Sequence, residues 1–310
     1  MPDLVANNLL GIAEHAALTP MVAYRIDRDG HPYVPIGDGG IVQGVRLGDS
    51  VFATDGDHVA PGVTLVHPDA GARFALTAFA CIGNEVIVRS GLAAGSIGRV
   101  TGKRGESGRV IALLDDDAMA KLLPGDQLSV RAVGQGFVPD GVPQGVAVLN
   151  VDPELFALLP FAVGGVGDDD AGTGTGTGAV ASDAVPVTVA VAGVLPSKVC
   201  GNGIGRPAQM WDVDLAVVAD SPDLGGRTMR LGELWAIEHL DVRHNMGYRR
   251  DWVTFGIICH GGSPLPGHGP GLVPIVTGPR SAFRLEVQDA DAAPALTDAV
   301  LAALPSRARS

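Results

Sequence analysis

The sequence predicts a mainly β protein, built from two β-rich barrel-like or sandwich-like halves with minor helix. Glycine and proline account for 44 and 22 of the 310 residues, which favours many short elements over long helices. Phrases in which a Gly-Asp or Gly-Glu turn precedes alternating apolar residues recur, as in RLGDSVFA, LPGDQLSV and RLGELWAI. Such phrases are typical of strands entered through tight turns.

A segment rich in glycine, threonine and aspartate divides the chain. Residues 164–184 contain almost nothing to bury, so we expect a flexible linker or surface loop there. This predicts an N-terminal β-rich domain at residues 1–163 and a C-terminal β-rich domain at residues 185–310. The alternative is a long insertion within one compact unit.

The first half is punctuated by turns. Residues 27–30 (DRDG) and 37–40 (GDGG) have turn chemistry, and Gly-Asp turns lead into short strands within residues 46–53 and 122–136. Further expected elements are a buried strand at residues 75–81, a strand at 85–88, a tight hairpin at 91–105 and helical turns at 115–123 and 152–159.

The second half consists mainly of apolar or alternating runs. These predict strands within residues 184–196, 210–220, 231–241 and 251–261, followed by a short helix at 291–304. We expect mainly antiparallel pairing, because the connections are short.

The composition excludes several classes of partner. The formal net charge is −12, whereas affinity for nucleic acid or an anionic membrane needs clustered lysine and arginine. No apolar segment is long enough to span a bilayer, and the first residues lack the features of a signal peptide. The three cysteines are widely spaced, as expected of free thiols in a reducing compartment. The expected location is therefore the cytoplasm.

One candidate site is the turn TDGDHVAPGVTL, in which Asp57 adjoins His58. A neighbouring carboxylate and imidazole can bind a metal ion, or the carboxylate can orient the imidazole as a general base. The alternative is an Asp-Gly turn with an exposed histidine.

The segment CHGGSPLPGHGPG carries His260 and His268 in a rigid loop after an apolar run. His260 ends a predicted strand, and glycine and proline fix the backbone around His268, which favours a preorganised site over a simple turn. A metal site would have to combine His58, His260 and His268 from distant segments, because no compact metal-binding motif occurs. We expect this loop to form one wall of a site between the two halves, opposite the turn that contains His58.

Other polar residues supply further candidates for catalysis or substrate binding. Glu85, which opens a strand, is a candidate acid or base; the alternative is a solvated edge residue. Candidates for substrate binding are Lys103, Asn202, Gly203, Arg249 and Arg250.

For each substrate-binding candidate, the sequence allows a binding role or a purely structural role. The glycines near residue 203 can point backbone N–H groups into a cavity, and the arginines can hold a carboxylate or pair with Asp241 and Asp251. Asp212 and Asp214 lie two residues apart on a predicted strand and therefore share one of its faces. They are either metal ligands or ordinary surface residues.

Several long phrases resemble a prokaryotic family of two-domain, β-rich proteins of unknown function. They are GDHVAPGV, ACIGNEVIVRSGLAAGSIGRVTGKRG, LLPGDQLSVRAVGQG and YRRDWVTFGIICHGGSPLPGHGPGLVPIVTG, which together span most of both halves. The resemblance implies the two-domain architecture and no particular reaction. The Gly-Thr segment departs from the family pattern as an insertion.

The leading hypothesis is an enzyme that acts on a small polar or carboxylate-bearing metabolite, with hydrolysis of an amide or cyclic amide as the first reaction to consider. A lyase, cyclase or isomerase that uses the same groups is the next alternative, followed by a non-catalytic module that binds a small ligand. RNA binding through residues 91–105 is opposed by the net charge. The sequence allows a divalent metal ion as the cofactor and a homodimer as the assembly.

Overall fold

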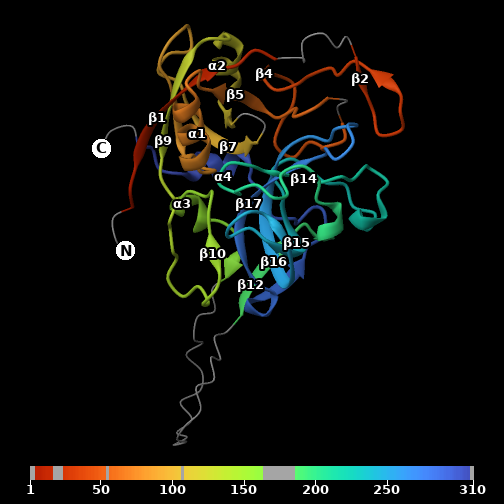
Figure 1. Ribbon diagram of the computed structural model, residues 1–310. Helices are drawn as coiled ribbons and strands as arrows, with labels where there is room; N and C mark the ends of the chain where they lie inside the picture. Colours follow the sequence, from red (N-terminus) through yellow and green to blue (C-terminus); the bar gives the residue numbers. More distant parts are fainter. Residues whose placement is uncertain (1–3, 17–23, 54–55, 106–107, 163–185, 308–310) are drawn as a thin grey trace, which may run out of the picture.

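The computed structural model describes residues 4–16, 24–53, 56–105, 108–162 and 186–307, and it confirms the mainly β fold (Figure 1). The linker predicted at residues 164–184 lies outside the described residues. The domain boundaries next to it remain a prediction.

Six antiparallel strands of the first half close into a barrel. Their order is β1-β9-β6-β7-β8-β5, and β5 pairs back onto β1. The barrel strands are β1 (Asn7–Ala13), β5 (Gly62–Val66), β6 (Glu85–Val88), β7 (Ile97–Arg104), β8 (Arg109–Leu113) and β9 (Gln127–Ala132). The short strand β4 (Ile41–Val42) pairs with β5, and β2 (Arg25–Ile26) and β3 (Pro32–Tyr33) form a separate hairpin.

The later strands form two further sheets. The six-stranded sheet contains β10 (Ala147–Val148), β13 (Gly193–Pro196), β14 (Val213–Asp214), β15 (Leu234–Asp241), β16 (Gly247–His260) and β17 (Gly271–Pro279). The three-stranded sheet contains β11 (Phe161–Ala162), β12 (Val187–Val191) and β18 (Phe283–Val287). Pairing is antiparallel except for β13 with β15 and β12 with β18.

Helices are short. They are α1 (Ala70–Phe79), α2 (Asp116–Lys121), α3 (Pro153–Phe156) and α4 (Asp298–Ala303), with 3-10 turns at Ser197–Val199, Pro222–Leu224 and Arg280–Ala282. The last three α-helices fall within the ranges predicted from the sequence. Each begins at an Asp or Thr whose side chain accepts a backbone N–H of the first turn, as expected for an N-cap.

The buried strand predicted at residues 75–81 is wrong, because most of this run belongs to α1. Asp69 caps the helix by accepting the backbone N–H of Ala72, and Leu76 faces the barrel core while Phe74 stays half exposed. A short apolar run fits a strand or a helix equally well, and the cap decides between them.

Two other predicted strands are shorter than expected or missing. The apolar run at residues 210–220 contributes only β14, and residues 50–53 form a turn after an isolated bridge between Ser50 and Arg230. Both segments lie in the loop-rich region that surrounds the site described below.

The barrel packs directly against the six-stranded sheet. Gly102 of β7 lies so close to Cys259 of β16 that no side chain fits between them. Ile111 of β8 shares one apolar core with Phe255 and Ile257 of β16. This packing brings the end of β7 next to the end of β16.

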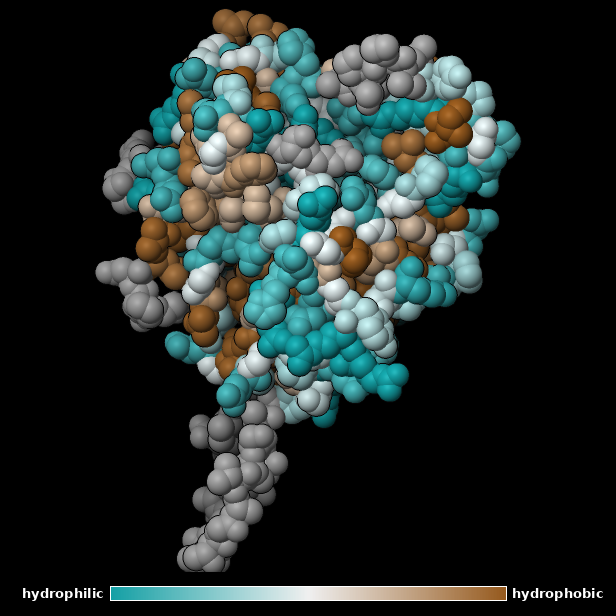
Figure 2. Space-filling model, viewed as in Figure 1, coloured by the Kyte–Doolittle hydropathy of each residue, from teal (hydrophilic) through white to brown (hydrophobic). Residues whose placement is uncertain are grey.

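The molecular surface is mixed in character. Figure 2 shows apolar side chains gathered over α1 and β1, where Phe74, Phe79 and Leu10 are at least 38% exposed. In the described part of the chain, no helix has the length and apolar composition needed to cross a bilayer. The homodimer remains a prediction.

Candidate functional site

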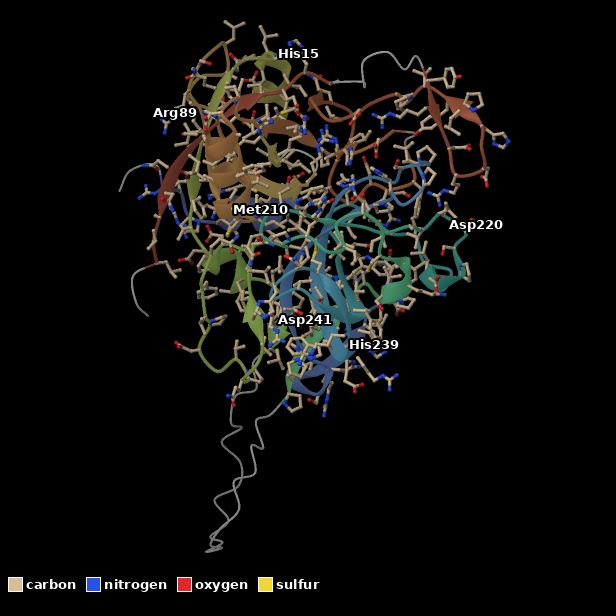
Figure 3. The ribbon with its side chains drawn as sticks, viewed as in Figure 1. His15, Arg89, Met210, Asp220, His239 and Asp241 are labelled. Atoms are coloured by element: carbon tan, nitrogen blue, oxygen red, sulfur yellow. The ribbon has the colours of Figure 1, made fainter. Side chains whose placement is uncertain are left out.

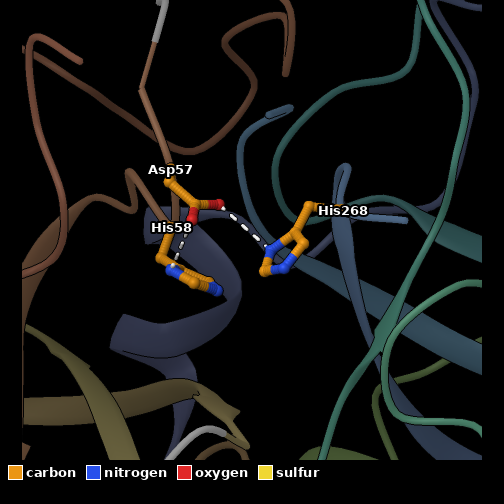
Figure 4. A group of neighbouring side chains, drawn as sticks. All are labelled: Asp57, His58 and His268. Carbon is orange, nitrogen blue, oxygen red and sulfur yellow. Dashed lines mark ion pairs between the residues drawn. The ribbon is translucent and has the colours of Figure 1, made fainter. Parts of the chain in front are cut away.

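Side chains from four separate segments meet where the barrel contacts the six-stranded sheet. We call this the histidine–aspartate cluster and define it as Asp57, His58, Asp212, Asp214, His260 and His268. The ring centroid of His58 lies 5.1 Å from that of His260 and 5.7 Å from that of His268. Figure 4 shows Asp57 beside both His58 and His268, with the two imidazoles facing each other. The structure therefore brings the three histidines singled out from the sequence together.

Local backbone features hold the histidines in place. His260 is the last residue of β16 and pairs with Gly271 of β17, where a Cβ atom would collide with the His260 ring and with Asp212. His58 has a φ of 52°, a left-handed conformation that is uncommon for a residue other than glycine. Such strain persists where the surrounding structure fixes it, often at functional sites.

The carboxylates from the first half are joined by arginines. Arg25 of β2 donates hydrogen bonds to Asp57 at 2.7 Å and to Asp38 at 2.5 Å. Asp38 also lies 3.4 Å from Nδ1 of His58 and 3.4 Å from Arg104 Nη1. Asp38 therefore orients His58 from behind, as carboxylates do for histidines that bind metals through the other ring nitrogen.

The carboxylates from the second half contact His260 and His268. His260 Nε2 lies 2.8 Å from Asp212 Oδ2 and 3.6 Å from Asp214 Oδ1, while Asp214 Oδ2 lies 3.6 Å from His268 Nδ1. Nδ1 of His260 is 3.0 Å from the carbonyl oxygen of Gly261. Because a carbonyl only accepts hydrogen bonds, Nδ1 carries a hydrogen, and Nε2 is the nitrogen that faces the carboxylates.

Burial and mutual proximity shift the pKa values in the cluster. Burial and the charge of Asp212 raise the pKa of Asp214 to about 8. Burial opposes protonation of His260, but its hydrogen bond to Asp212 and the two carboxylate charges outweigh this and raise its pKa to about 9. Burial lowers the pKa of His58. Closely spaced groups with opposite shifts of this kind are typical of functional sites.

The cluster has the composition and spacing of a metal site. Asp57, His58 and His268 form one group of potential ligand atoms within 4.8 Å of one another, and His58, Asp214 and His260 form a second. Oδ1 of Asp57 and Oδ1 of Asp214 are buried and accept no hydrogen bond from the described residues. A buried carboxylate oxygen without a donor is costly, and a bound cation would remove that cost.

The other residues predicted from the sequence lie apart from the cluster or at its edge. Asn202 is at the edge: its N–H donates to Gly267, next to His268, its carbonyl accepts from Asp214, and Gly203 follows it in the same turn. Lys103 Nζ is fully buried, and it donates to Thr77, Asn150 and Gln209.

Glu85 and the two arginines have different surroundings. Glu85 accepts hydrogen bonds from Ser306 and Arg307 of the C-terminal segment. Arg249 pairs with Asp241, one of the two alternatives left by the sequence, and Arg250 is exposed on the same strand. Figure 3 places Asp241 and His239 at the lower end of the molecule and His15 at the upper end.

No sequence signal identifies the residues around the cluster. Asp38 lies in a segment that predicts only a turn, and Arg25 lies in a short hairpin without a motif. Arg25 reaches Asp57, which is 32 residues away in the chain, and Asp38, which is 13 residues away, so these contacts depend on the tertiary structure.

Two of the cavities on the described surface differ in their relation to the cluster. The larger, about 520 Å³, lies between β7, β8 and α4 and contains no member of the cluster. The smaller, about 260 Å³, is lined by Phe52, Val217, Ser263 and Pro264 among others. Ser263 also lies beside Asp57 and lowers the pKa of that carboxyl, so the smaller cavity borders the cluster.

Comparison with known proteins identifies both parts of the chain. The profile described as "Domain of unknown function (DUF4438), N-terminal" matches residues 24–157, and the corresponding C-terminal profile matches residues 179–295. The crystal structure of TM1086 is similar to this chain at 32% sequence identity, with 92% of this chain and 94% of that chain covered and a TM-score of 0.79. No curated protein matches the chain.

Proposed function

The chain belongs to the DUF4438 family, and from the chemistry of its buried cluster we propose that it binds one divalent transition-metal ion and uses it to hydrolyse a small molecule. The proposed ligands are His58, which belongs to both groups of closely spaced donor atoms, and His260 and His268, one from each group, with Asp57 and Asp214 as the carboxylates beside them. Binding of one ion by all three histidines draws the two groups together. We call this set the metal centre.

The observation that carries the proposal is an excess of buried negative charge. Asp57, Asp212 and Asp214 are each at most 5% exposed, and the side chain of Asp38 is 11% exposed. Arg25 and Arg104 are the two guanidiniums within ion-pair distance of these four carboxylates in the described chain. With all four carboxylates ionised and the histidines neutral, two negative charges remain, and burying them is unfavourable unless a cation or protons compensate. In the metal-free protein, protons on Asp214 and His260 supply that compensation, because the pKa values of both groups are raised. A single divalent ion would replace those protons.

The donor set indicates the kind of metal. Imidazole nitrogens together with carboxylates suit zinc, iron, manganese or cobalt, whereas magnesium and calcium prefer oxygen ligands alone. Catalytic zinc sites commonly use three protein ligands and leave one position open. With three histidines and two adjacent carboxylates, the cluster has enough donors for such a site.

Hydrolysis is the reaction that suits this arrangement best. A divalent ion lowers the pKa of a water that it binds to about 7, which supplies a nucleophile at neutral pH. A cluster carboxylate that is not a ligand can accept the proton lost by the water and return it to the leaving nitrogen of an amide. Of the three histidines, His268 has the most exposed side chain, at 18%, so the open position is expected on its side.

A structural metal is the second candidate, and the burial of the cluster favours it. His260 is 0% exposed, and neither the cavity of about 520 Å³ nor that of about 260 Å³ is lined by any of the three histidines. A purely structural ion would hold the segments together without turnover. Structural sites are closed to further ligands, whereas catalytic sites keep an open position, so binding of small anions to the metal distinguishes the two.

The experiment that tests the proposal is metal analysis of untagged protein purified without chelators. We expect about one equivalent of zinc, iron, manganese or cobalt, and loss of that metal in His58→Ala, His260→Ala and His268→Ala. His244→Ala is the matched control, because His244 is exposed and outside the cluster. Turnover of small amides by the metal-loaded protein, lost with the metal, tests hydrolysis. A folded wild-type protein that neither carries nor takes up a divalent metal would overturn the proposal.

A further inference from the structure

Tyr33 is a partly buried tyrosine beside the metal centre. Its Oη atom is buried and makes no hydrogen bond of good geometry to the residues that the structure describes, although the side chains of Arg25 and Ser263 lie near it. A buried hydroxyl without a partner destabilises a folded protein, so its presence calls for an explanation.

The hairpin geometry places Tyr33 on the side of the cluster. Tyr33 of β3 pairs directly with Arg25 of β2, and directly opposed residues in an antiparallel pair project from the same face. Arg25 donates to Asp57, so Tyr33 faces the cluster from the same side. Burial and the charge of Asp57 raise the pKa of Tyr33, which keeps the phenol protonated and able to donate.

The unused donor and the unused acceptors are complementary. Oδ1 of Asp57 and Oδ1 of Asp214 accept no hydrogen bond of good geometry in the described chain; His268 Nδ1 and His260 Nε2 lie 3.4 and 3.6 Å from them, respectively. The Tyr33 hydroxyl likewise lacks a partner at good geometry among the described residues. A metal ion would occupy the acceptors. An oxygen atom bound to that metal would then accept the hydrogen bond from Tyr33.

We propose that Tyr33 donates a hydrogen bond to the water or substrate oxygen that occupies the open position of the metal centre. The inference rests on the proposed function. It assigns Tyr33 the role of a preorganised donor toward the oxygen on which negative charge develops during attack on a carbonyl group.

The adjacent cavity defines the substrate class. Ser263 lies beside both Tyr33 and Asp57, and it also lines the cavity of about 260 Å³. The rest of that wall is mixed: Phe52, Val217 and Pro264 are apolar, whereas Asp27, Arg28 and Asp29 are charged. The substrate is therefore a small carbonyl compound with both an apolar and a polar group, of a size below that of most drug-like ligands.

The test uses the cobalt-loaded full-length protein and azide, a compact anion that binds cobalt and accepts hydrogen bonds. Azide binding is followed by visible absorption in wild type, Tyr33→Phe and Tyr24→Phe. Tyr24 precedes β2 and is 51% exposed, so it is the matched control. We expect Tyr33→Phe to retain cobalt, to keep or raise its Tm, and to bind azide about tenfold more weakly, since one hydrogen bond is lost.

The outcomes separate this inference from the proposed function. Equal azide affinity in wild type and Tyr33→Phe overturns the role of Tyr33 and leaves the metal centre standing. Failure of the wild type to bind cobalt or zinc overturns the proposed function, and the role of Tyr33 with it. If Tyr33→Phe does not fold, a crystal structure of zinc-loaded wild type with azide decides: Tyr33 Oη within about 3.2 Å of the azide supports the inference, and a longer distance overturns it.

Discussion

Replacing Asp214 by asparagine should stabilise the metal-free protein and weaken its response to zinc. Asp214 is 4% exposed, lies 3.6 Å from both His260 and His268, and its Oδ1 accepts no hydrogen bond from the described residues. Asparagine has nearly the same shape and no charge. The substitution therefore removes the carboxylate that the metal-free cluster accommodates least well.

The magnitude follows from the pKa of this group. The pKa of Asp214 rises from 3.8 to about 8 on folding. The metal-free wild type therefore loses stability as the pH rises from about 4 to about 8, because the folded state holds a proton that the unfolded state releases. A shift of roughly four units, at about 1.4 kcal/mol each, sets an upper limit of roughly 6 kcal/mol. Because His260 shares the charge, we expect Asp214→Asn to gain about 2 kcal/mol at pH 8.

The assay is urea unfolding at pH 8, first in EDTA and then in a modest excess of zinc. Zinc should stabilise the wild type by RT ln(1 + [Zn]/Kd), about 2.7 kcal/mol at a free concentration of 100 times Kd, and should stabilise Asp214→Asn less at the same zinc concentration. Asp212→Asn is the contrast: Asp212 accepts hydrogen bonds from His260 and the backbone of Gly105, so its loss should destabilise the metal-free protein. A less stable metal-free Asp214→Asn protein, or an unchanged response to zinc, would refute the reasoning.

Three further substitutions test other parts of the account. Lys103→Met should lower the free energy of unfolding by about 2 to 3 kcal/mol, because three buried acceptors lose their donor; an unchanged urea midpoint would contradict this. Gly271→Ala should displace His260 and lower the metal content, whereas Gly247→Ala, at a site with open space, should not; equal metal content in both would count against the geometry. Glu85→Ala should lower the Tm by weakening the C-terminal contacts while metal content and turnover stay unchanged; loss of turnover at full metal content would instead make Glu85 catalytic.

Much of the fold follows from local patterns in the sequence. The Gly-Asp turn before β9, the apolar runs that became β15 and β16, and the capped beginnings of α2 and α3 each carry their own signal. The helix α1 does not, because an apolar run after an ordinary aspartate fits either structure. The parallel pairing of β13 with β15 and of β12 with β18 arises from long connections, about which local patterns carry no information.

The sequence predicts some residues of the site and not others. The histidines stand out because rigid glycine- and proline-rich turns surround them, and the structure brings all three together. Asp38, Arg25 and Tyr33 lie in ordinary turns and a short hairpin, and only the tertiary structure shows their relation to Asp57. Lys103 has a basic neighbourhood in the sequence, but its ammonium group instead joins a buried network that links the two halves.

The most direct test of the metal centre is the position of the bound metal in crystals of the untagged protein, from anomalous diffraction at the zinc edge after zinc loading. The account predicts one strong peak per chain, about 2.0 to 2.1 Å from one nitrogen each of His58, His260 and His268, with an oxygen of Asp57 or Asp214 beside it. No peak in the cluster, or a peak only at exposed residues such as Asp29 and His31, would contradict the proposed metal centre.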